Sequence, residues 1–298
     1  MPVIVPGHAM SFLASTHFFR RAISRGLTAV MMLWAINAQA QAPHLEAEVV
    51  YVQDLDSSNV LLDKNSNEIR PIASISKLMT ALVVADARQS MSEKLTIADD
   101  DVDRMRFSRS RLPVGATLTR ADMLHLALMS SENRAAHALG RHYPGGMPAF
   151  VRAMNDKARA LGMRNTYFVE PTGLSADNVS TPRDLVKLLA AVNKHPTLQH
   201  YTTSERYSVQ LSKNRVLTYQ NTNRLVRNSA WNIQVSKTGF INEAGQCLVM
   251  LTQINNRSVA IVLLNASGRY SRIGDAVRIR DLVESRAPAQ RQVALLKP

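Results

Sequence analysis

The residues of this chain that could do covalent chemistry begin with a serine and a lysine three positions apart. Ser74 and Lys77 form an S-x-x-K pattern at the start of an apolar stretch with helical spacing. This spacing places the two side chains one turn apart on nearly the same side of a helix. A serine hydroxyl needs a nearby base to attack a carbonyl, and a lysine can serve when burial lowers its pKa. The pattern predicts a serine nucleophile, with an N-cap serine beside a solvated lysine as the alternative.

A second pattern, S-x-N, runs from Ser131 to Asn133, where two predicted helices meet. A hydroxyl at such a joint could relay a proton, and the amide could hydrogen-bond a substrate amide. Plain helix capping is the alternative. The S-x-N pattern also begins at Ser57, in a predicted hairpin turn ahead of the S-x-x-K, and at Ser212, in a β-rich segment. Neither of these places is a helix junction, so Ser131 and Asn133 are the candidates.

The third pattern is Lys237-Thr238-Gly239, on a strand predicted over residues 233–240. A cation and a hydroxyl side by side suit a substrate carboxylate. The glycine would let a substrate backbone approach the strand closely. A strand end with a turn glycine would give the same letters, so none of the three patterns is specific alone.

The elements that must position these side chains follow from the spacing of apolar residues. Residues 46–62 alternate and predict a hairpin with its turn at 54–59. After Pro71 the spacing predicts a helix with one buried stripe that points away from Ser74 and Lys77. The stripe consists of Ile75, Leu78, Met79, Leu82 and Val83.

The remaining pattern defines the fold class. Further helices are predicted at 119–129, 131–139, 148–161, 181–192 and 272–284, and strands at 233–235, 247–251 and 259–264. Strands at both ends of the chain flank a helical middle. The predicted class is α+β, with an antiparallel sheet built from N- and C-terminal strands and a helical insert at about 97–200.

The order S-x-x-K, S-x-N, K-T-G in this layout is a strong joint signal. The chain resembles the penicillin-recognising serine enzymes, which have the β-lactamase and DD-transpeptidase fold. It is more similar still to low-molecular-mass penicillin-binding proteins, in particular the D-alanyl-D-alanine endopeptidase branch. The segments that carry this likeness are residues 70–80, 128–136, 169–175 and 237–240, and the likeness covers residues 45–285.

The resemblance implies a role for each candidate residue. Ser74 would attack the carbonyl of a D-alanine and form an acyl-enzyme, Lys77 would take its proton, and Ser131 would pass a proton to the leaving amine. The substrate would be bound by Asn133, Lys237, Thr238, Gly239 and Phe240. The backbone N–H groups of Ser74 and Phe240 would form the oxyanion hole. Water would release the acyl group, and neither a metal nor an organic cofactor would be needed.

Charge and the N-terminal segment indicate where such an enzyme would work. The 298 residues carry a net charge of +13, which suits nucleic acid, an acidic polymer or membrane surface, or only a proteome that is basic on average. Residues 1–40 contain no acid, carry three arginines ahead of an uncharged apolar run and end in Ala-Gln-Ala. They predict a secretory signal peptide, with an uncleaved anchor as the alternative reading and Met10 as an alternative start. Export to the periplasm argues against nucleic acid and leaves at most a loose membrane association.

The expected function is cleavage of D-alanyl-diaminopimelate cross-bridges in peptidoglycan. The expected partners are its peptide stems and, as covalent inhibitors, β-lactam antibiotics. A D-alanyl-D-alanine carboxypeptidase is the alternative, ahead of a β-lactamase or a non-catalytic cell-wall-binding protein. The peptidase domain is expected over residues 41–285 and a short tail over 286–298, without room for the C-terminal β-domain and anchor of many carboxypeptidases.

Four other features are set aside. Glu170 resembles the deacylating glutamate of class A β-lactamases, but its neighbours match the peptidase form of that loop. Cys247 is the one cysteine, which excludes an intrachain disulfide, and its apolar strand predicts a buried thiol. His195 and His200 have no evident third ligand for zinc. The arginines at 104, 106, 109 and 111 are expected to form a solvated face or to touch the anionic cell wall.

Overall fold

The computed structural model describes residues 1–3, 44–268 and 270–285. Apart from residues 1–3, the predicted signal peptide lies outside these residues, as does the predicted C-terminal tail. The contacts divide the chain into a unit that ends at Ala42 and a folded unit that begins at Pro43, and the folded unit is described below. In the described part of the chain, no helix is long and apolar enough to cross a membrane.

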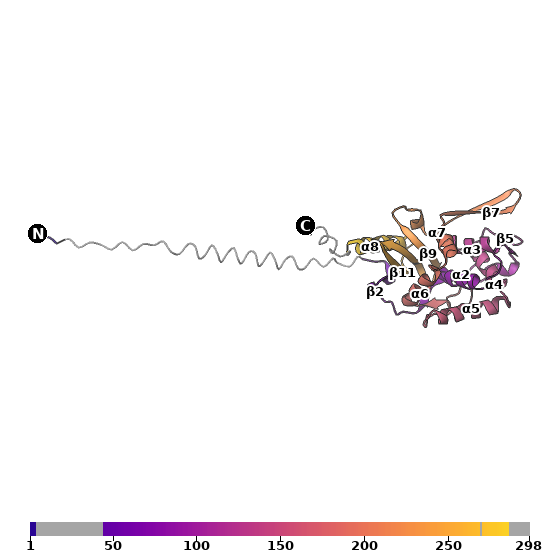
Figure 1. Ribbon diagram of the computed structural model, residues 1–298, viewed down its shortest axis with the longest axis horizontal. Helices are drawn as coiled ribbons and strands as arrows, with labels where there is room; N and C mark the ends of the chain where they lie inside the picture. The colour runs from indigo at the N-terminus through magenta and orange to yellow at the C-terminus, as the bar shows by residue number, and fades with distance from the viewer. Residues whose placement is uncertain (4–43, 269, 286–298) are drawn as a thin grey trace, which may run out of the picture. The chain divides into compact units, whose positions relative to one another are not determined.

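A five-stranded antiparallel sheet joins both ends of the folded unit (Figure 1). Val50 in the first strand lies opposite Leu263 in the last, and Leu263 in turn lies opposite Leu248. The strands run in the order β2-β1-β11-β10-β9, with bounds β1 Ala47–Asp54, β2 Val60–Lys64, β9 Asn232–Ile241, β10 Gly245–Ile254 and β11 Arg257–Ala266. The α+β class, the N-terminal hairpin and the pairing of N- with C-terminal strands, all predicted from the sequence, are confirmed.

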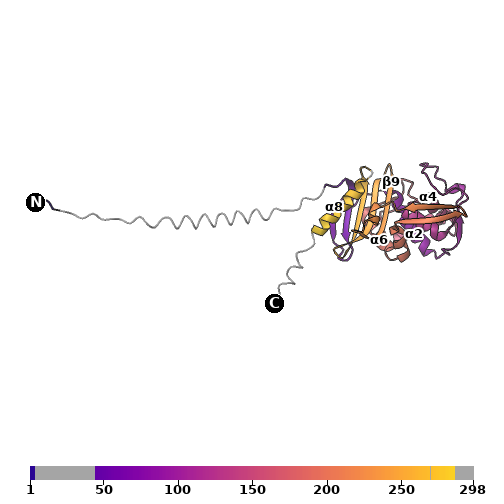
Figure 2. The ribbon, with the colours of Figure 1, turned by 90° about the horizontal axis from the view of Figure 1, so that it is seen from above.

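Both faces of the sheet are covered, which explains why its central strands are apolar without a break. Side chains alternate between the two faces of a strand, and along β11 Val262 joins one core while Ile261 joins the other. Helix α6 (Pro182–Val192) packs on the first face and α8 (Ser271–Ser285) on the second (Figure 2). Among the described strands only β10 pairs with β9. The other edge of β9 therefore has no partner strand among them and can line the site.

The helix that follows Ser74 is buried on every side. A short 3₁₀-helix, η1 (Ala73–Ser76), leads directly into α2 (Lys77–Asp86), and the first eight residues of α2 are all buried. The expected single stripe is therefore wrong. Neighbouring helices surround α2, so that even the polar side chains of Lys77 and Thr80 are enclosed.

The other predicted helices are present with slightly shifted ends. The Thr119 hydroxyl accepts a hydrogen bond from the Asp122 N–H and caps α3, as the sequence predicted. Helix α7 was not predicted from the sequence, because it is largely polar and only its Leu198 and Thr202 are buried. The bounds are α3 Arg120–Met129, α4 Asn133–Arg141, α5 Gly146–Ala160 and α7 Pro196–Thr203; the short elements are β3 Arg70–Pro71, β4 Lys94–Thr96, η2 Asp99–Asp101, β5 Thr117–Thr119, β6 Val179–Ser180, β7 Arg206–Ser212, β8 Arg215–Gln220 and η3 Arg224–Arg227.

Candidate active site

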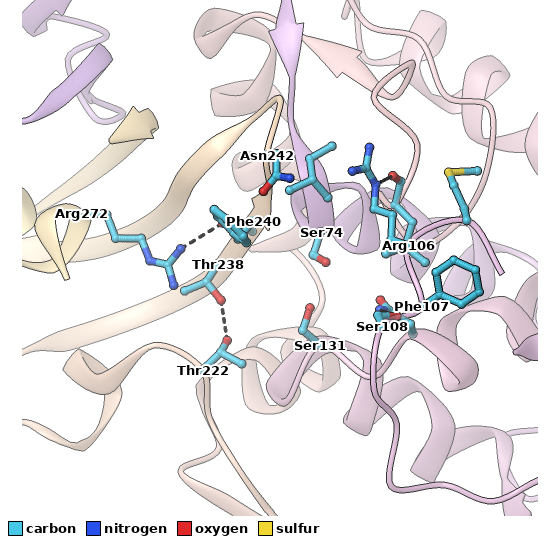
Figure 3. A pocket seen from close by; sticks show the side chains of 15 residues that line it. Ser74, Arg106, Phe107, Ser108, Ser131, Thr222, Thr238, Phe240, Asn242 and Arg272 are labelled. Carbon is cyan, nitrogen blue, oxygen red and sulfur yellow. Dashed lines mark hydrogen bonds between the residues drawn. The ribbon is translucent and has the colours of Figure 1, made fainter. Parts of the chain in front are cut away.

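A cleft of about 630 Å³ runs beside β9 and is lined by most of the residues that the sequence singled out (Figure 3). Lys77 and Lys237 lie behind its wall, 0% and 1% exposed. The predicted residues on the wall itself are Ser74, Ser131, Asn133, Thr238, Gly239 and Phe240. The structure therefore gathers all the predicted site residues around one cleft.

Ser74 is held at the cleft by close packing of backbone on both sides of η1. A Cβ on Gly173, which has φ +78°, would fall 1.8 Å from the carbonyl oxygen of Ala73. A Cβ on Gly239 would fall 3.1 Å from the nitrogen of Ser74. Only glycine fits at 173, and at 239 glycine lets β9 approach η1 closely. The backbone of Ser74 thus lies against the part of β9 that leads to Phe240, as an oxyanion hole requires.

Lys77 has three oxygen neighbours, and two of them can only accept hydrogen bonds. Its Nζ lies 3.0 Å from Ser74 Oγ, 2.7 Å from Asn133 Oδ1 and 2.6 Å from the carbonyl oxygen of Thr172. Burial lowers the pKa of Lys77 from 10.5 to about 8, against the opposing effect of nearby carboxylates. A neutral amine has two hydrogens, which go to the amide and carbonyl oxygens because these cannot donate. The lone pair of neutral Lys77 therefore faces the Ser74 hydroxyl and can take its proton.

Lys237 contacts Ser131 in a second lysine–serine pair. Its Nζ lies 2.9 Å from Ser131 Oγ and 2.8 Å from the carbonyl oxygen of Thr238. Burial, and then the charge of Lys77, hold the pKa of Lys237 well below its usual value. Ser131 has φ +61° at the joint between α3 and α4, a conformation that serine rarely adopts. Because Lys237 donates to Ser131 Oγ, the proton of Ser131 is left to be donated into the cleft.

Asn133 links Lys77 to the opposite wall of the cleft. Its Oδ1 accepts from Lys77, and its Nδ2 donates to Ser108 Oγ at 2.9 Å. These two contacts fix the orientation of the amide. One Nδ2 hydrogen remains for a substrate carbonyl, since a side-chain amide has two.

The carboxylate of Glu170 is occupied within its own loop. One oxygen accepts from the N–H and hydroxyl of Thr172 at 2.6 and 2.5 Å. The other accepts from the N–H of Gly173 at 2.6 Å and from Asn178 Nδ2 at 3.0 Å. Glu170 thus holds the loop whose Thr172 carbonyl contacts Lys77.

Two residues at the end of the cleft beyond Thr238 are not among those predicted from the sequence. Thr222 Oγ1 lies 2.6 Å from Thr238 Oγ1, and Arg272 Nη1 donates to the carbonyl oxygen of Gly239 at 2.9 Å (Figure 3). Arg272 and Thr238 offer a cation and a hydroxyl at the same end, which suits a carboxylate. No short motif marks either missed residue. The one available signal is that Arg272 opens the predicted closing helix.

Arg106 lies at the opposite end of the cleft. Its Nε donates to the carbonyl oxygen of Leu174, and its Nη2 lies 2.9 Å from the Glu243 carboxylate. It therefore links the Glu170 loop to the turn after β9. The expectation of a solvated arginine face is wrong for Arg106, because its side chain is only 23% exposed.

Two further expectations concern groups outside this cleft. Cys247 is buried, and burial raises the pKa of its thiol to about 11, so it is a poor nucleophile. In the described ranges, no group of three or more His, Cys, Asp or Glu side chains could hold a metal ion.

The fold and the serine–lysine chemistry of the cleft are those of a serine DD-peptidase. The model of the D-alanyl-D-alanine carboxypeptidase family, peptidase family S11, matches residues 36–268. The chain belongs to this family, and the resemblance predicted from the three motifs is confirmed.

Individual relatives give the same result. A D-alanyl-D-alanine endopeptidase of Escherichia coli (strain K12) is 49% identical over 247 residues, 83% of this chain and 80% of the relative. A D-alanyl-D-alanine endopeptidase of Pseudomonas aeruginosa is 51% identical over 235 residues, which are 78% of this chain and 76% of the relative. Among solved structures, penicillin-binding protein D2 from Listeria monocytogenes in its ampicillin-bound form matches with a TM-score of 0.69 at 30% identity, over 80% of this chain and 98% of that one.

Proposed function

We propose that this chain is a D-alanyl-D-alanine endopeptidase that cuts the D-alanyl-diaminopimelate cross-bridges of peptidoglycan through an acyl-enzyme on Ser74. The observation that carries the chemistry is the geometry at Lys77, whose Nζ lies 3.0 Å from Ser74 Oγ. The choice of bond is supported by the endopeptidases of Escherichia coli and Pseudomonas aeruginosa, which are 49% and 51% identical to this chain.

Acylation follows from the contacts around the two serines. Ser74 Oγ bonds to the carbonyl carbon of the D-alanine while its proton passes to Lys77 Nζ. The N–H groups of Ser74 and Phe240 stabilise the oxyanion, by about 3–4 kcal/mol for each donor. The C–N bond then breaks, and Ser131, supported by Lys237, relays the proton that Lys77 has taken to the departing amine. Water attacks the acyl-enzyme in the second step and frees Ser74.

Substrate binding uses both ends of the cleft. The free Nδ2 hydrogen of Asn133 binds a carbonyl of the donor stem, and the glycine at 239 lets that stem lie along the edge of β9. Thr238 and Arg272 bind the carboxylate beside the scissile bond, and Lys237 contributes to the electrostatic field there from behind the wall. In a cross-link, the carbon that bears the leaving nitrogen also bears a free carboxylate, as it does in a terminal D-alanine. A D-alanyl-D-alanine carboxypeptidase is therefore the second candidate, favoured by this shared carboxylate and by the family's description.

Digestion of purified muropeptides distinguishes the two candidates. An endopeptidase converts cross-linked dimers to monomers, whereas a carboxypeptidase removes only the terminal D-alanine of pentapeptides. Ser74→Ala is the matched control and is expected to do neither. Dimers that persist while pentapeptides are trimmed would reject the endopeptidase.

Labelling with a fluorescent penicillin separates an enzyme from a cell-wall-binding protein. The wild type is expected to form a persistent covalent adduct that Ser74→Ala does not form. Folded wild-type protein that takes no label would contradict the nucleophile, and rapid penicillin turnover without an adduct would indicate a β-lactamase instead.

The proposed place of action is the periplasm, with residues 1–40 as a signal peptide, the peptidase domain over 41–285 and a tail over 286–298. The composition of the N-terminal segment supports the export signal. The positive charge favours attraction to the anionic wall. Sequencing the N-terminus of the exported protein tests this: a mature chain that begins near residue 41 is expected, and an intact N-terminus in membranes would indicate an anchor.

A further inference from the structure

A second hollow opens from the carboxylate end of the catalytic cleft. It measures about 340 Å³ and shares two wall residues, Thr222 and Arg272, with the cleft. Its other wall residues are Gln220, Asn221, Arg224, Arg227, Tyr270 and Ile273. The shared residues lie beyond Thr238 as seen from Ser74 (Figure 3), so the hollow continues the cleft past its carboxylate end.

Two arginines on this wall contact neutral groups. Arg224 Nη2 donates to the hydroxyl of Tyr270 at 3.1 Å, and its guanidinium carbon lies 4.6 Å from the centroid of that ring. Arg227 Nη1 donates to Gln220 Oε1 at 3.0 Å. Neither forms an ion pair with a carboxylate in the part of the chain that the structure describes. With Arg272 on the shared wall, the hollow presents three guanidinium groups to an occupant.

The segment that carries these arginines is fixed to the catalytic strand. Asn223 caps η3 and is buried, and its Nδ2 donates to Ser236 Oγ at 2.8 Å, one residue before Lys237. Thr222 is joined to Thr238 by the 2.6 Å contact between their hydroxyls. The backbone of η3 is therefore preorganised relative to the cleft, so little ordering of the backbone is needed when a ligand binds.

The substrates of the two candidate activities differ at this end. A pentapeptide stem ends with the leaving D-alanine. In a cross-link, the leaving amine belongs to a diaminopimelate whose side chain continues into the acceptor stem. That stem carries further free carboxylates, on its glutamate and at its C-terminus, and guanidinium groups bind carboxylates strongly.

Resting on the proposed endopeptidase function, we propose that this hollow is the subsite for the acceptor stem, in which Arg224 and Arg227 bind its carboxylates. The subsite extends the cleft past the bond that is cut. It makes cross-linked peptides better substrates than uncross-linked ones, because only the former reach the two arginines.

The test compares two substrates in two double variants. Arg224→Gln with Arg227→Gln removes two cations from the subsite, and the matched control Lys213→Gln with Arg215→Gln removes two exposed cations that line neither hollow. The quantity measured is kcat/KM on a cross-linked dimer divided by kcat/KM on a monomeric pentapeptide. This ratio is expected to fall about tenfold or more in the subsite variant and to stay at the wild-type value in the control. The rate of penicillin labelling verifies that each variant is folded.

A change in the substrate gives an independent measurement. Amidation of the acceptor-stem carboxylates of the dimer is expected to slow the wild type about as much as the double substitution does, and to have little further effect on the subsite variant. An unchanged ratio, or amidation that slows both proteins equally, overturns the subsite. A wild type that trims pentapeptides but leaves dimers intact overturns the endopeptidase function itself, an outcome that the pentapeptide arm identifies separately.

Discussion

The Nζ of Lys77 lies 2.6 Å from the carbonyl oxygen of Thr172, 95 positions further along the chain. Together with Asn133 Oδ1 at 2.7 Å, this oxygen takes up the hydrogens of the neutral amine and leaves the lone pair for Ser74. The direction in which the base acts is therefore set by a loop that is remote in sequence. The loop and the lysine can be tested separately.

The rate of Ser74 acylation is predicted to rise with pH through about pH 8. Only neutral Lys77 can accept a proton, and burial lowers its pKa to about 8. With that pKa, the neutral form makes up about one tenth of the enzyme at pH 7 and about nine tenths at pH 9. The measurement is the second-order rate constant for acylation by a fluorescent penicillin, from about pH 6 to about pH 10, which reports the free enzyme. A constant rate across this range, in protein that stays folded, would contradict Lys77 as the base.

Glu170→Gln is predicted to shift this profile toward lower pH. The Glu170 carboxylate raises the pKa of Lys77, so without its charge the effect of burial is less opposed. The new amide also fits the N–H donors of Thr172 and Gly173 less well, and a lower melting temperature is expected. Slower release of the acyl group with an unchanged acylation profile would instead give Glu170 the deacylating role of the class A β-lactamase glutamate.

Residue spacing predicted the parts of the site that depend on local geometry, and missed those that depend on long-range packing. Ser74 and Lys77 lie one helical turn apart, which alone brings them together. The enclosure of Lys77 depends on the helices that surround α2, and no spacing within the chain encodes it. Arg272 lies in the first turn of α8 and reaches the cleft through a contact with Gly239 that spans 33 positions without a repeating pattern.

The pairing of the strands could be predicted from the sequence more completely than the surroundings of individual side chains. The apolar runs in β10 and β11 are buried on both faces, which requires a central place in the sheet. The alternating N-terminal hairpin then supplies the neighbour on one side. The position of Arg106 at the cleft could not be predicted from the sequence, because a run of arginines is most often solvated.

Gly173→Ala is predicted to misplace Ser74. The new Cβ would fall 1.8 Å from the Ala73 carbonyl oxygen, at a φ of +78°, so the loop or η1 must move. A loss of at least about 2 kcal/mol in unfolding free energy is expected, with a much lower acylation rate. Gly115→Ala is the matched control, because Gly115 has φ +86° and none of the described residues lies within 4 Å of the added Cβ. Urea unfolding and penicillin acylation are the measurements, and equal losses in both variants would show that backbone conformation, not the contact with η1, is responsible.

Arg272→Gln is predicted to weaken the recognition of substrates with a free carboxylate beside the scissile bond. The guanidinium lines the cleft and donates to the carbonyl oxygen of Gly239. Glutamine keeps a donor for this oxygen but loses the charge, so kcat/KM on a peptide that ends in D-alanyl-D-alanine is expected to fall about 10- to 100-fold. The same peptide with its terminal carboxylate amidated is the control, and wild type and variant are expected to cleave it at similar rates. A variant that is equally impaired on both peptides would contradict carboxylate binding, and would mean that Arg272 acts by positioning β9 through the Gly239 carbonyl.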